Sequence, residues 1–130
     1  MFEFQLDPTS GVATYLQLVH QVRQALRLGV LRPGDQLPTA REVVAKLAIN
    51  PNTVLKAYRD LEREQLVGAR PGQGTFVLRT LDGPGPDTSA RFARELASWM
   101  SAARAAGLGG EDIEAIYRAT VRDTFAAGVA

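Results

Sequence analysis

The chain has 130 residues, of which 45% are hydrophobic and 22% are charged, with a formal net charge of +1. These values favour a folded chain with a modest core over a disordered one. With no cysteine and a single histidine, it has neither a disulfide framework nor a thiolate metal site. No apolar run reaches the roughly 18 residues that a membrane span needs, and the start lacks a signal-peptide pattern. We therefore expect a cytoplasmic protein that binds no membrane, no metal and no cofactor.

The charge is distributed almost evenly along the chain. Residues 1–78 hold nine Lys/Arg and seven Asp/Glu, a balance of +2, whereas residues 79–130 hold six and seven, a balance of −1. A nucleic-acid partner would therefore have to be bound by the placement of charges and not by their excess.

The first predicted elements are an extended, turn-rich lead over residues 1–12 and a helix from about Ala13 to Leu28. Apolar residues recur through this helix at spacings of three and four, which gives it one face to bury. Gly29 can end it in the left-handed conformation.

Two closely spaced helix starts come next in the chain. After a Pro-Gly turn and a brief strand near Gln36–Leu37, Thr39 and Glu42 form a capping box that opens a helix ending near Ala48. Asn50 and Pro51 then suit the cap and first position of a third helix, which runs to about Gln65. Two helices joined by three or four residues are typical of a helix-turn-helix.

The third helix has two unlike faces. Its apolar stripe is Val54, Ala57, Tyr58 and Leu61, and the opposite side carries Asn52, Lys56, Arg59 and Arg63. Such a polar, cationic side can lie in a DNA major groove. The alternative is a solvated face on which nearby carboxylates pair with the cations.

A β-hairpin is predicted directly after this helix. Residues 66–70 and 75–78 have strand character, and residues 71–74 form a turn with two glycines. A hairpin in this place is typical of a wing, whose Arg70 and glycine-containing tip could approach a phosphate backbone. The alternative is a glycine-rich hairpin chosen for turn geometry alone.

The last third of the chain predicts a separate pair of helices. A linker of breakers covers residues 80–87, and helices follow over about 88–106 and 111–127, divided by a glycine-rich loop. Each helix carries an aromatic-bearing apolar stripe, and two helices cannot shield both stripes by pairing only with each other. We therefore expect a homodimer through these C-terminal helices, with a four-helix arrangement.

Several ordered blocks of this sequence resemble the GntR family of bacterial transcription regulators. The resemblance covers about Tyr15 to Val77 and is carried by Leu31–Glu42, Asn50–Val54, Ala57–Glu62 and Gly72–Val77. The short tail is similar to the YtrA-like branch of the family. The resemblance implies an α+β fold, with a winged helix-turn-helix domain over residues 1–79 and a two-helix dimerisation segment over residues 88–130.

The resemblance also implies which residues meet DNA. It assigns this role to Arg41, to Asn50, Asn52, Thr53 and Lys56 at the third helix, and to Arg70 and Gly72 in the wing; the cationic face adds Arg59. The chain departs from the family pattern at three positions. Gln65 replaces a glycine at the end of the third helix, so we expect a strained left-handed residue or a different cap there. Ala48 replaces the usual glycine in the turn. Leu55 replaces an often polar residue.

The expected function is a sequence-specific, double-stranded-DNA-binding transcription regulator, acting as a repressor on an inverted-repeat operator. A winged-helix module that binds another protein and not DNA is the alternative. We expect no enzyme activity, because no nucleophile–histidine pair, paired carboxylates or phosphate-binding loop stands out. The operator and any small-molecule effector are not readable from the residues.

Overall fold

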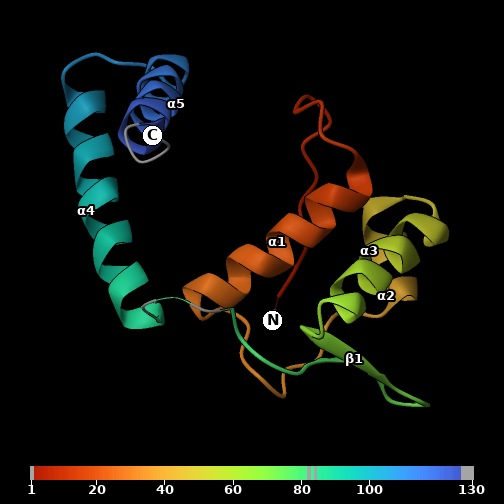
Figure 1. The fold of residues 1–130 in the computed structure, drawn as a ribbon. Coiled ribbons are helices and arrows are strands. Elements are labelled where there is room, and N and C mark those ends of the chain that lie inside the picture. The colour runs from red at the N-terminus through yellow and green to blue at the C-terminus, as the bar shows by residue number, and fades with distance from the viewer. Residues whose placement is uncertain (1, 82, 84, 127–130) are drawn as a thin grey trace. The chain divides into compact units, whose positions relative to one another are not determined.

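The computed structural model describes residues 2–81, 83 and 85–126. In chain order its elements are α1 (Thr14–Leu28), α2 (Ala40–Leu47), α3 (Pro51–Arg63), β1 (Val67–Arg70), β2 (Gly74–Val77), α4 (Pro86–Ala105) and α5 (Gly110–Ala126) (Figure 1). The chain divides into two compact units, residues 1–89 and 90–130. Asp82 and Pro84 of the predicted linker, and Ala127 of the predicted last helix, lie outside the described residues.

The predicted helices and hairpin are present, with bounds that differ by one or two residues. Gly29 ends α1 with a φ of 74°, as predicted. The main difference is at α4, which begins at Pro86, inside the segment expected as a linker. Proline is well suited to the first turn of a helix, because an N–H group there would have no acceptor within the helix. Asp87 adds a negative charge close to the positive end of the helix dipole, which stabilises the start of α4.

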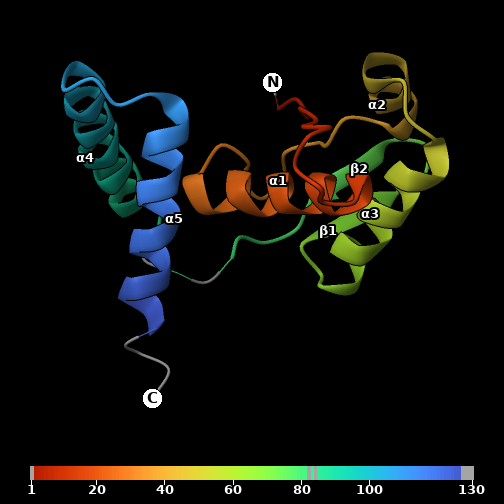
Figure 2. The ribbon, with the colours of Figure 1, turned by 90° about the horizontal axis from the view of Figure 1, so that it is seen from above.

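The first unit is a winged helix-turn-helix, with α1, α2 and α3 around one core and the hairpin beside it (Figures 1 and 2). α3 packs against both α1 and α2. The largest fully buried side chains of the core are Leu18, Val22, Leu26, Leu37, Val54, Leu61, Leu66, Val67 and Val77. The apolar stripe predicted for α3 is therefore the side that faces the core.

The hairpin is antiparallel and attached to the segment that precedes α2. Val67 pairs with Val77 at one end of the ladder and Arg70 with Gly74 at the other. The strand predicted near Gln36–Leu37 is reduced to one bridge, Gln36 to Phe76. The Leu37 N–H donates to the Thr75 carbonyl at 2.9 Å, so the wing is tied to the chain just before the helix-turn-helix.

The N-terminal lead is a packed element, which we call the N-terminal strap (residues 2–7). Phe4 is only 4% exposed and belongs to the core. The side-chain amides of Gln17 and Gln21, both on α1, bond the backbone of the strap: Gln21 pairs with the N–H and carbonyl of Gln5, and Gln17 with those of Asp7. The strap thus lies along α1 as a neighbouring strand would.

The second unit is the helix pair α4 and α5, which lie side by side (Figure 2). Ala103 is a buried apolar residue of this unit, whereas most of the larger apolar side chains are well exposed. Phe92, Leu96, Trp99, Ile116, Tyr117, Val121 and Phe125 are each between 39% and 69% exposed. Among the described residues, no helix combines the length and apolar character required to cross a membrane.

Candidate nucleic-acid interface

The turn between α2 and α3 is held by side-chain caps at both helix starts. The Thr39 hydroxyl accepts from the Glu42 N–H at 3.1 Å, and the Glu42 carboxylate accepts from the Thr39 N–H, so the predicted capping box is formed. Asn50 Oδ1 accepts from the Asn52 N–H at 2.8 Å. Asn50 is therefore the N-cap of α3, and only its amide NH₂ is left to donate to a ligand.

The outward side of α3 is polar and exposed from its first turn to its middle. Asn52, Lys56 and Arg59 are exposed, and Thr53 is half-buried. Arg63, further along, is engaged with Asp60 of the same helix, with Nη1 and Oδ1 2.9 Å apart. No ion pair of Lys56 or Arg59 occurs among the residues that the structure describes. The available positive charge of α3 therefore lies in its middle, at Lys56 and Arg59.

A shallow depression of about 400 Å³ lies where the starts of α1 and α3 meet. It is lined by Thr14, Tyr15, Asn50, Asn52, Thr53 and Lys56. Lys56 Nζ lies 3.9 Å from the centroid of the Tyr15 ring, a cation–π contact that restrains the ammonium. The N–H groups at the first turn of each helix favour a negatively charged group nearby. The depression therefore has the chemistry to hold a backbone phosphate.

Thr14 and Tyr15 were not predicted as site residues. The sequence shows Tyr15 as one more apolar residue of the first helix, and nothing in the local pattern pairs it with a lysine 41 positions later. The approach of α1 to α3 brings the two side chains together.

Arg41 lies in the first turn of α2 and is exposed. The partial positive charge of a helix start disfavours a cation there by about 0.3–1 kcal/mol. No ion pair with Arg41 offsets this cost within the described part of the chain. Helix stability therefore does not explain this arginine, whereas an anionic ligand would.

The wing presents Arg70 at the end of β1. Its guanidinium carbon lies 4.2 Å from the centroid of the Phe76 ring on the paired strand, so the arginine is stacked and its charge is presented at the hairpin end. Gly72 at the tip has a φ of 74°, and no atom lies within 4 Å of where a Cβ would be. The tip is therefore narrow and can approach another molecule closely.

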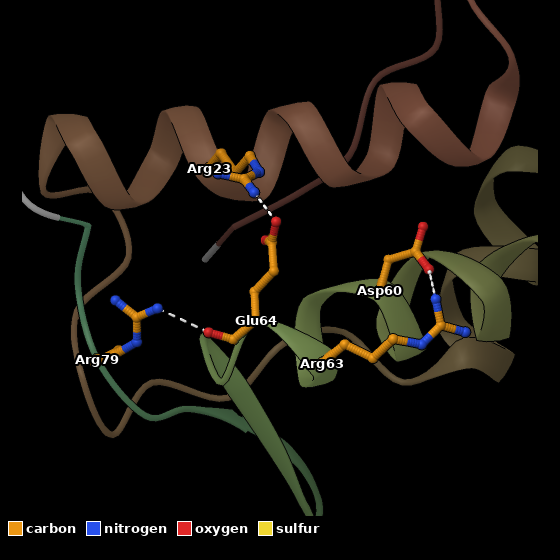
Figure 3. Close-up of polar contacts among 5 residues, drawn as sticks. All are labelled: Arg23, Asp60, Arg63, Glu64 and Arg79. Atoms are coloured by element: carbon orange, nitrogen blue, oxygen red, sulfur yellow. Dashed lines mark hydrogen bonds and ion pairs between the residues drawn. The ribbon is translucent and has the colours of Figure 1, made fainter.

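The C-terminal end of α3 is locked in place by charged side chains (Figure 3). Arg23 of α1 forms an ion pair with the Glu64 carboxylate. Arg79, after the wing, donates from Nη2 to the Glu64 backbone carbonyl at 2.7 Å. These contacts anchor the C-terminal end of α3 to α1 and to the segment after β2. The part of α3 that remains exposed to another molecule is the part before this end.

Comparisons with known proteins agree with this fold. The family model for bacterial regulatory proteins of the gntR family matches residues 14–77. The HTH-type transcriptional regulator Rv1152 of Mycobacterium tuberculosis is 36% identical over 104 residues, which cover 80% of this chain and 82% of that protein. The HTH-type transcriptional repressor YtrA of Bacillus subtilis is 41% identical over 73 residues, or 56% of each chain, so the match spans little more than half of YtrA.

Two solved structures are similar over almost the whole chain. One is a transcriptional antiterminator from Listeria monocytogenes EGD-e, with a TM-score of 0.58, 28% identity and coverage of 94% of this chain and 92% of that one. The other is a transcriptional regulator from Oenococcus oeni, with a TM-score of 0.52, 32% identity and coverage of 89% and 97%. The two sequence relatives are regulators of transcription and not enzymes. Together with the family match, they establish that this chain belongs to the gntR family of bacterial regulatory proteins.

Proposed function

We propose that the protein is a sequence-specific repressor that binds an inverted-repeat operator as a homodimer. In this proposal residues 1–79 bind DNA and residues 88–130 hold two subunits together. The observation that carries it is the outward side of α3, where Asn52, Lys56 and Arg59 are exposed and the depression at the starts of α1 and α3 is lined by Asn52 and Lys56. The repressor role is supported by the likeness to YtrA of Bacillus subtilis. A chromosomal operator would place the protein in the cytoplasm.

Each candidate residue has a role in this proposal that follows from its chemistry. Asn52 pairs with the N6 and N7 edge of an adenine, and Arg59 reaches a guanine edge or a phosphate. Lys56 and Thr53 hold a phosphate in the depression, with the Asn50 amide as a further donor. Arg41, Arg70 and the Gly72 tip contact phosphates on either side of the groove.

The exposed side chains of α4 and α5 support the homodimer. Phe125 is 69% exposed, Phe92 is 53% exposed and Trp99 is 40% exposed. An apolar groove of about 490 Å³ runs between the helices, lined by Leu96, Trp99, Ile116, Tyr117, Thr120, Val121, Thr124 and Phe125. Burying a large apolar side chain is worth roughly 1.5–3 kcal/mol, so a second copy covering this groove would gain stability. Two-fold symmetry then requires operator half-sites about one helical turn apart, or a multiple of it.

A salt titration tests the proposal. Binding duplexes would be selected from a random-sequence pool, and their affinity measured by gel shift at several salt concentrations. Affinity should fall steeply with salt, because bound phosphates release counterions. Lys56→Ala should reduce the slope of log affinity against log salt by about one for each half-site contacted, and Arg41→Ala should behave in the same way.

Arg27→Ala is the matched control for these variants. Arg27 is an exposed arginine in the last turn of α1, and about 18 Å of helix separates it from Tyr15 at the depression. Its removal should leave the salt slope unchanged. If the wild-type protein selects no duplex from the pool, or if Lys56→Ala and Arg27→Ala have the same slope as the wild type, the proposed interface is wrong.

A further inference from the structure

Leu55 is a large apolar side chain on the presented part of α3, and neither the core nor the cationic face explains it. It is 45% exposed, while the core contribution of the helix comes from Val54, Ala57, Tyr58 and Leu61. Leu47 at the end of α2 and Ile49 in the turn both pack against the core, whereas Leu55 does not. It is the only exposed large apolar residue of α3, all of whose residues the structure describes.

The position of Leu55 places it at the edge of the polar side of α3 that carries Asn52, Lys56 and Arg59. At about 100° per residue, it lies about 60° around the helix from Asn52 and about 40° from Arg59. These residues are at i−3 and i+4 from Leu55, which makes them its neighbours along the helix surface. Leu55 is also within the first two turns of α3, the part of a recognition helix that contacts base edges.

We infer that Leu55 is a specificity-determining residue that contacts the C5-methyl group of a thymine in the operator; this inference rests on the proposed DNA-binding function. The thymine methyl is the only apolar group that base pairs present in the major groove. Against any other base edge, the leucine would displace water from hydrogen-bonding groups without replacing their bonds. Leu55 therefore selects for thymine by attraction and against the other bases by desolvation.

The operator should show this preference next to the base that Asn52 reads. Asn52 favours adenine, and Leu55 is its neighbour on the helix surface, so each half-site should carry a thymine close to that adenine. Selection from a random duplex pool should enrich this thymine with the wild-type protein. With Leu55→Ala the enrichment at that position should disappear, while the adenine remains enriched.

Replacing thymine by deoxyuridine, which lacks only the methyl group, provides the decisive experiment. Each thymine of the selected operator is replaced in turn, and affinities are measured for the wild type and for Leu55→Ala. At one thymine in each half-site, loss of the methyl should weaken wild-type binding about fourfold. The same replacement should leave the affinity of Leu55→Ala unchanged, because the contact is already gone.

Leu28→Ala is the matched control, since Leu28 is also an exposed leucine, 52% accessible, at the end of α1. It should respond to every deoxyuridine as the wild type does. If each deoxyuridine affects wild type and Leu55→Ala equally, the inference about Leu55 is overturned while DNA binding stands. If the wild type selects no duplex at all, the proposed function itself fails. The melting temperature of Leu55→Ala, expected to match that of the wild type, shows that a lost thymine preference in this variant is not caused by misfolding.

Discussion

Two non-glycine residues adopt the left-handed conformation just after the two helices of the helix-turn-helix, α2 and α3. Ala48, after α2, has a φ of 54° and a ψ of 46°, and Gln65, just after α3, has a φ of 60°. At Gln65 the resemblance predicted a strained left-handed residue or a different cap, because a residue with a Cβ replaces the expected glycine. Ala48 also replaces an expected glycine, and the structure shows the left-handed conformation there as well. The left-handed conformation costs a residue with a side chain about 1–2 kcal/mol relative to the right-handed one. Glycine avoids this cost, but it loses more conformational entropy on folding, which offsets part of the gain.

Glycine at these positions should stabilise the protein. Ala48→Gly and Gln65→Gly should each raise the free energy of unfolding by about 0.5–1 kcal/mol, or the melting temperature by about 2–8 °C. The control is Ala45→Gly, the same change at an exposed interior position of α2, which should lower stability by about 1 kcal/mol. If Ala48→Gly and Ala45→Gly change the melting temperature in the same direction, the left-handed conformation of Ala48 is contradicted.

The Tyr58 hydroxyl is a second residue-scale feature, because it is buried and donates to the Pro38 carbonyl. Burial, and then the charge of Glu42, raise the pKa of Tyr58 above its ordinary value near 10. The folded protein therefore keeps a proton that the unfolded chain loses at high pH. The contribution to stability is complete below about pH 10 and falls as the pH rises above it.

Removing the hydroxyl tests this contribution. Tyr58→Phe should lower the free energy of unfolding by about 1–2 kcal/mol at about pH 8, because the Pro38 carbonyl loses its donor. Between about pH 9 and pH 11 the variant should lose less stability than the wild type, which urea unfolding at each pH measures. If the free energy of unfolding falls equally with pH in the two proteins, the pKa of Tyr58 is not raised by folding.

At the scale of elements, the N-terminal strap is held to α1 by a match between two repeats. Residues four apart on a helix are about 6.0 Å apart, and residues two apart on an extended chain are about 6.6 Å apart. Gln17 and Gln21 can therefore bond Asp7 and Gln5 in turn, each through a donor and an acceptor. The strap reaches α2 as well, where Lys46 Nζ lies 2.6 Å from a Glu3 oxygen.

Gln21→Glu tests this attachment with almost no change in shape. The carboxylate keeps the bond from the Gln5 N–H but faces the Gln5 carbonyl with an acceptor in place of a donor. The free energy of unfolding should fall by about 1–2 kcal/mol, and cleavage of residues 2–7 by a protease should accelerate. Gln24→Glu makes the same charge change at an exposed residue of α1 and should alter neither measurement.

At the scale of the whole molecule, the proposed homodimer predicts that α4 and α5 control DNA affinity without touching DNA. Trp99→Glu places a charge in the apolar groove and should convert a dimer into folded monomers in analytical ultracentrifugation. Operator affinity should then fall by at least about tenfold, because the two half-sites are no longer bound by linked subunits.

Arg94→Ala is the control for this prediction. It also lowers the net charge by one, but Arg94 lies about 140° around α4 from Trp99, away from the groove. It should remain dimeric and bind the operator as the wild type does. A wild-type protein that is monomeric at micromolar concentration, or a Trp99→Glu protein that remains dimeric, would contradict dimerisation through this groove.

The sequence by itself determined the helices, the hairpin and the helix-turn-helix, because their signals are local. The Thr39–Glu42 capping box, the Asn50–Pro51 start and the Gly29 stop each act within a few residues, so the pattern of side chains specifies them directly. The two faces of α3 follow from helical periodicity alone. The outward position of Asn52, Lys56 and Arg59 was therefore predictable.

Only the tertiary structure decided which distant residues support that face. The contact of Lys56 with Tyr15, the anchoring of Glu64 by Arg23 and Arg79, and the packing of Phe4 in the core with Tyr58 join residues 15 or more positions apart. No local pattern records such pairs, because they exist only once the apolar faces of α1 and α3 have packed together. The pairing of Arg63 with Asp60, by contrast, joins residues three apart on one helix and belongs to the local features that the sequence could indicate.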